Sequence, residues 1–82
     1  MSGVLGVVKS DVVMASATLT YHPKDQTITI KVDNHVEHIS TEFKTKAQIF
    51  DAVKYACISK GAIISDIELT AVLQLVYEDL DG

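Results

Sequence analysis

The chain has 82 residues, with 7 lysines, no arginine, 11 acidic residues and a formal net charge of −4. This length fits one domain spanning residues 1–82. A hydrophobic content of 48% is too high for intrinsic disorder, and a single cysteine excludes an intramolecular disulfide. The lack of arginine disfavours direct binding to nucleic acid, because phosphate contacts depend on basic side chains.

The sequence contains no stretch that resembles a transmembrane helix or a signal peptide. Charged residues interrupt the apolar stretches well before the ~18 uninterrupted residues that a membrane span needs. The apolar residues near the start follow no positively charged segment. We therefore expect a cytoplasmic protein with no membrane partner.

The first half of the chain has the period-two pattern of strands. Residues 3–14 are rich in valine and predict an edge strand, with residues 1–10 open to fraying. Apolar and polar side chains alternate over residues 15–21 and again over residues 27–32, separated by a turn around Pro23. A third strand ends near residue 41, which gives a three-stranded antiparallel meander over residues 15–41.

The register of the second hairpin depends on whether its loop has two or three residues. A two-residue loop pairs Val32 with His35 and puts Glu37 on the apolar face. A three-residue loop pairs Val32 with Val36 and Lys31 with Glu37, which matches opposite charges across the strands. We favour the three-residue loop, which also places His38 on the apolar face.

Two helices follow the strands. Thr45 and Gln48 form a capping box before a helix over residues 46–60, which ends at Gly61. Ser65 and Glu68 form a second one before a helix over residues 66–80. Each helix has an apolar stripe, so the sequence predicts an α+β fold with both helices packed on one sheet face.

No catalytic, metal or cofactor site stands out. Cys57 falls on the buried side of the first helix, where a thiol acts as a small apolar side chain. His35 and His38, with His22 at a nearby strand end, suggest a zinc site, but residues three apart on a strand, such as His35 and His38, point to opposite faces. The four glycines form no phosphate-binding loop. We therefore predict no enzyme activity, no metal and no cofactor.

The negative charge lies at one end of the chain. Residues 66–82 contain five acids and no base, whereas residues 1–65 have seven lysines and six acids. The C-terminal acids Glu78, Asp79 and Asp81 are typical of a solvated, solubilising tail. The alternative is a docking surface for a basic partner, on which the acids imitate nucleic acid.

Several apolar side chains lie outside the predicted helix stripes. They are Tyr55 and Ile58 on the first helix and Ile67, Ala71 and Leu75 on the second. Either the valine-rich N-terminal segment covers them as a further layer, or a partner does. Two-fold self-association is the commonest arrangement of that kind, so we predict a homodimer formed through the helices.

These features favour a small non-catalytic protein that binds another protein. Small acidic chains without catalytic motifs are typical of phage- or mobile-element-encoded inhibitors of host proteins. The predicted partner-binding residues are Tyr55, Ile58, Ile67, Ala71, Leu75, Glu78, Asp79 and Asp81. The alternative is a sponge-like oligomer that binds a small ligand at its subunit interface.

Overall fold

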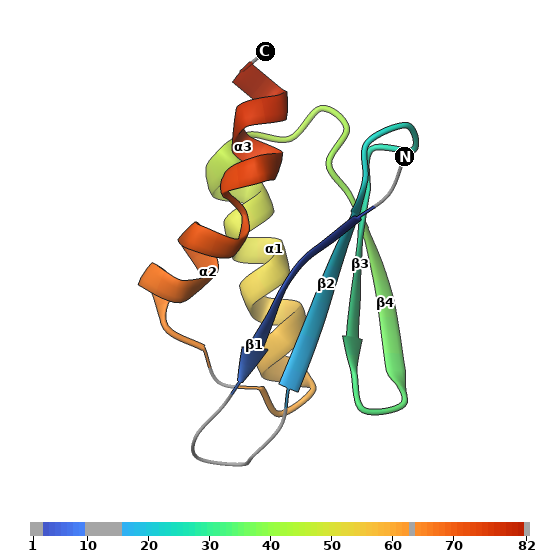
Figure 1. The fold of residues 1–82 in the computed structure, drawn as a ribbon, viewed down its shortest axis with the longest axis vertical. Coiled ribbons are helices and arrows are strands. Elements are labelled where there is room, and N and C mark those ends of the chain that lie inside the picture. The colour runs from blue at the N-terminus through green and yellow to red at the C-terminus, as the bar shows by residue number, and fades with distance from the viewer. Residues whose placement is uncertain (1–2, 10–15, 63, 82) are drawn as a thin grey trace.

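A computed structural model describes residues 3–9, 16–62 and 64–81. Within them the strands are β1 (Gly3–Lys9), β2 (Ser16–His22), β3 (Thr27–Val32) and β4 (His35–Ser40). The helices are α1 (Lys46–Ser59), α2 (Asp66–Val72) and α3 (Gln74–Asp81). All three helices lie on one face of the sheet (Figure 1), so the predicted α+β class is confirmed.

The sheet is an antiparallel meander in the order β1-β2-β3-β4. The predicted meander corresponds to β2, β3 and β4, and the valine-rich segment adds β1 as an edge strand. The pairing of β1 with β2 shifts register between Val4 and Gly6. The remaining part of the predicted edge segment, residues 10–14, and the predicted first strand residue, Ala15, lie outside the described residues.

The predicted register of the second hairpin is wrong. Val32 pairs with His35 and Ile30 pairs with Glu37, so the loop has two residues. Asp33 adopts a φ of 54°, the left-handed conformation that such a loop needs at its first position. The Glu37 carboxylate is tolerated beside the apolar face because it accepts a hydrogen bond from the Lys60 ammonium at the end of α1.

His38 is therefore on the opposite face from the one predicted. It pairs with Thr29, and its side chain is exposed on the sheet face that carries no helix. This follows from the register, because a shift of one residue moves every side chain of a strand to the other face.

The predicted capping box at the start of α1 and the predicted glycine stop after it are confirmed. The Thr45 hydroxyl accepts from the Gln48 backbone N–H, and the Gln48 side chain accepts from the Thr45 N–H. Gly61 follows the helix with a φ of 94°, which favours glycine. The apolar side of α1 contacts β3 and β4, so this helix covers one half of the sheet.

The predicted second helix is divided into α2 and α3. Ser65 caps α2 by accepting from the Glu68 N–H, and α2 ends at Val72 with Leu73 as its C-cap. After this break Tyr77 is buried, whereas Leu80, which the apolar stripe of the predicted helix would bury, is exposed. A straight helix would diverge from a twisted sheet. The break between α2 and α3 keeps α3 against the core.

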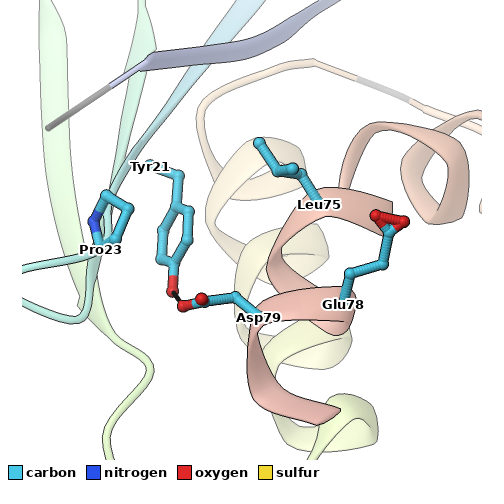
Figure 2. Close-up of a pocket in the computed structure, with 5 residues that line it drawn as sticks. All are labelled: Tyr21, Pro23, Leu75, Glu78 and Asp79. Atoms are coloured by element: carbon cyan, nitrogen blue, oxygen red, sulfur yellow. Dashed lines mark hydrogen bonds between the residues drawn. The ribbon is translucent and has the colours of Figure 1, made fainter. Parts of the chain in front are cut away.

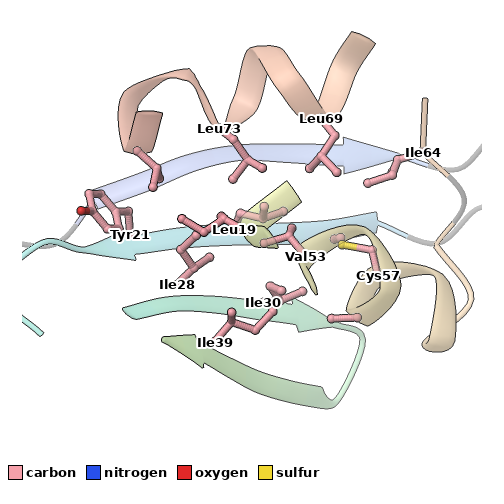
Figure 3. Close-up of a cluster of buried hydrophobic side chains, with 14 of the residues drawn as sticks. Leu19, Tyr21, Ile28, Ile30, Ile39, Val53, Cys57, Ile64, Leu69 and Leu73 are labelled. Atoms are coloured by element: carbon pink, nitrogen blue, oxygen red, sulfur yellow. The ribbon is translucent and has the colours of Figure 1, made fainter. Parts of the chain in front are cut away.

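One hydrophobic core lies between the sheet and the helices (Figure 3). α2 contacts β1, while α1 contacts the other edge of the sheet. The buried apolar side chains are Ala17, Leu19, Tyr21, Ile28, Ile30, Val32, Ile39, Ile49, Val53, Ala56, Cys57, Ala62, Ile64, Leu69, Leu73, Val76 and Tyr77.

None of the described helices has the length and apolar character needed to cross a membrane.

Candidate functional site: an acidic pocket beside the C-terminal helix

A pocket of about 350 Å³ lies between α3 and the end of β2. Tyr21 and Pro23 line it from the sheet side, and Leu75, Glu78 and Asp79 line it from the helix (Figure 2). Leu75 and Glu78 are one helical turn apart and so lie on the same side of α3. The pocket thus combines apolar walls with two carboxylates.

Tyr21 joins the two sides of the pocket. Its hydroxyl donates a hydrogen bond to Asp79 Oδ2 at 2.5 Å, and the Tyr21 residue is only 3% exposed. Burial, together with the bond to Asp79, raises the pKa of the Tyr21 phenol to about 12. The phenol therefore stays protonated at neutral pH and holds the carboxylate in place.

The C-terminal acids are exposed, as expected of a solvated tail, but two of them also contact the body of the domain. Besides the Asp79 bond, Asp81 forms an ion pair with Lys46 at 2.6 Å. Glu78 is exposed and makes no ion pair with any described residue. The sequence could not reveal this attachment, because Tyr21 and Lys46 are distant from these acids along the chain.

All eight predicted partner-binding residues are exposed. Leu75, Glu78 and Asp79 come together at the pocket. Tyr55 and Ile58 lie on α1, where the Tyr55 residue is 75% exposed, and Ile67 on α2 is 85% exposed. Asp81 is occupied by its ion pair with Lys46.

The described part of the N-terminal segment, residues 3–9, does not form the further layer that was the alternative to a partner. Residues 3–9 form a strand of the sheet itself, hydrogen-bonded along β2. The exposed apolar side chains of α1 and α2 belong to helices whose other sides pack on that sheet. Among the described residues, therefore, no further layer covers them.

Sequence reasoning missed Phe43, in the loop between β4 and α1. Its side chain is the most exposed of the large apolar ones described, at 96%, and its backbone has a φ of 60°. This left-handed conformation is uncommon for a bulky residue. The Phe43 backbone thus presents an aromatic ring to the surroundings, close in sequence to the cap of α1.

The open face of the sheet carries two histidines bridged by a threonine. His22 Nε2 and His38 Nδ1 each lie 3.0 Å from the Thr29 hydroxyl oxygen. That hydroxyl has one proton and two lone pairs, so it can donate to at most one of the two rings and accepts from a ring nitrogen that carries a proton. Within the described ranges, no group of three or more His, Cys, Asp or Glu side chains has a metal-binding arrangement.

The burial predicted for Cys57 is confirmed. The residue is fully buried in the core, and burial raises the pKa of its thiol to about 11. A protonated, inaccessible thiol is a poor nucleophile.

Searches of protein-family models, curated protein sequences and solved structures found no significant match. The function must therefore be inferred from the surfaces of this chain.

Proposed function

We propose that this chain is a non-catalytic protein-interaction domain that associates through the outer side of its helices, including with a second copy of itself. The observation that carries the proposal is the exposure of large apolar side chains on helices whose inner sides already fill the core. Tyr55, Ile67 and Leu75 are 75%, 85% and 59% exposed. Large exposed apolar side chains on helices whose inner sides are already packed favour an interaction surface.

The types of side chain support an interface. Tyrosine supplies a large, amphipathic contact area and is common among residues that dominate binding energy. The exposed ion pairs Lys54–Asp66 and Lys46–Asp81 lie on the same helices. Polar groups around apolar anchors resemble the usual anatomy of an interface, with an apolar centre and a polar rim.

Sedimentation velocity tests the self-association. The wild-type chain should form a concentration-dependent dimer, and Tyr55→Glu and Ile67→Glu should shift the equilibrium towards the monomer. Gln74→Glu is the matched control, because it adds one negative charge at another exposed helical position. A wild-type chain that stays monomeric at high micromolar concentration would remove the homodimer from the proposal.

Capture from a host lysate tests binding to another protein. The chain should retain a defined partner, and Leu75→Glu should release it while Gln74→Glu does not. Within this proposal, the chain acts in the cytoplasm as a phage- or mobile-element-type inhibitor, and the captured partner should lose activity when the chain is added. Retention of the same proteins by Leu75→Glu and the wild type would contradict the proposed surface.

A second candidate function is small-ligand binding by an oligomer. The pocket favours it, since about 350 Å³ is within the usual size range of ligand sites. A ligand that raises the melting temperature in the absence of any protein partner would support this alternative. A melting temperature unchanged across a broad metabolite panel would favour the protein-binding function.

A further inference from the structure

We propose that the pocket between α3 and β2 binds a basic side chain, lysine or arginine, of a partner protein. This inference rests on the proposed protein-binding function and adds the chemistry of the contact. The pocket has apolar walls and two carboxylates, which suits a group with an aliphatic stem and a cationic end.

The charges at the pocket are uncompensated within the described chain. Neither Glu78 nor Asp79 has a lysine partner, because the described ion pairs use Lys46, Lys54 and Lys60 with other acids. Lys24 follows Pro23 in the neighbouring turn but makes no ion pair with either carboxylate. Glu78 and Asp79 therefore each offer an available carboxylate to a cation from outside the chain.

One of those carboxylates is already oriented. The Tyr21 hydroxyl binds one oxygen of Asp79, Oδ2, at 2.5 Å, which restricts the rotation of the side chain. The second oxygen, Oδ1, accepts no hydrogen bond from a described residue. A group that is held in place before binding loses less conformational entropy when the partner arrives.

The walls match the rest of a basic side chain. Pro23 offers a ring surface on one side and Leu75 an aliphatic surface on the other, with the nearly buried Tyr21 between them (Figure 2). The methylene groups of lysine or arginine pack on such surfaces while the charged end reaches the carboxylates.

Short peptides test the inference by chemical-shift mapping on the ¹⁵N-labelled full chain. The probes are acetyl-Ala-Arg-Ala-amide and its lysine equivalent, with the uncharged citrulline and norleucine peptides as controls. The basic peptides should shift the amide signals of Tyr21, Leu75, Glu78 and Asp79, and added salt should weaken the effect. The uncharged peptides should leave these signals in place.

Two substitutions test whether each pocket carboxylate contributes to binding of the basic peptide. Glu78→Gln and Asp79→Asn should each weaken binding of the arginine peptide by about threefold to fivefold, the range for partly exposed ion pairs. The asparagine amide oxygen can still accept from Tyr21, so the fold should be retained. Asp51→Asn, which removes an exposed carboxylate from α1, should leave the affinity unchanged.

Several results would overturn the inference. They are equal shifts with the citrulline and arginine peptides, shifts away from the pocket, or no shift at millimolar peptide. Binding of n-butylguanidine as tight as that of the peptide would assign the pocket to a small molecule instead. Failure of this inference can be told apart from failure of the proposed self-association, because Tyr55→Glu and Ile67→Glu change residues that do not line the pocket.

Discussion

Replacing Tyr21 by phenylalanine removes the hydroxyl that joins β2 to α3 and leaves the buried ring in place. The hydroxyl donates at 2.5 Å to a carboxylate, and the Tyr21 residue is only 3% exposed. A hydrogen bond to a charged group contributes about 1.5–3 kcal/mol net. Because Asp79 is exposed and water can replace its lost donor, we expect a loss around the lower end of that range, about 1–2 kcal/mol.

Urea unfolding at neutral pH measures this loss as a lower midpoint with an unchanged slope. Tyr77→Phe is the control, since Tyr77 is also buried but its hydroxyl makes no hydrogen bond to a described residue. Its effect should be within about 0.5 kcal/mol. Equal stabilities of the Tyr21→Phe and Tyr77→Phe variants would refute the assigned role of the hydroxyl.

The same bond predicts a dependence on alkaline pH. Folding raises the pKa of Tyr21 from 10.0 to about 12, so between these values the folded chain binds more protons than the unfolded chain. The contribution of Tyr21 is therefore complete below pH 10 and is lost as the pH rises towards 12. The stability difference between the wild type and Tyr21→Phe should shrink over this interval, and a constant difference would contradict the argument.

Three further changes test other parts of the fold. Thr45→Ala should lower the free energy of unfolding by about 1 kcal/mol through loss of the α1 cap, and Thr45→Ser should restore most of it in the same urea assay. Gly61→Ala should cost about 1 kcal/mol from backbone strain alone, because a Cβ there meets no atom within 4 Å; a neutral or stabilising effect would contradict this. Cys57 should react with a disulfide reagent slowly in the folded chain and fast in urea, because its thiol is buried and its pKa is raised to about 11. Rapid reaction without denaturant would show that the core opens at α1.

The sequence predicted those features that depend on neighbouring residues. Alternation located β2 and β3, and the Thr45 and Gln48 side chains located the start of α1. The hairpin register failed because local charge matching favoured Lys31 as the partner of Glu37. In the structure that partner is Lys60, which is 23 residues away and reaches Glu37 only after α1 has packed on the sheet.

The candidate site was predicted only in part for a similar reason. Leu75, Glu78 and Asp79 stood out as off-stripe or acidic residues of the C-terminal helix. Tyr21 and Pro23 looked like an ordinary strand end and turn, and no local pattern relates them to α3. Their role follows from tertiary packing, which brings residues 58 positions apart within hydrogen-bonding distance.

The position of α2 has a consequence for folding during synthesis. Neighbouring strands of the meander are consecutive in the chain, so hairpins can form as soon as each strand leaves the ribosome. The contact of α2 with β1, however, joins a late element to the first one. The part of the apolar sheet face that α2 covers therefore stays exposed until α2 and α3 have been synthesised. Nascent chains shortened before Asp66 should consequently depend on chaperones more than the full chain does.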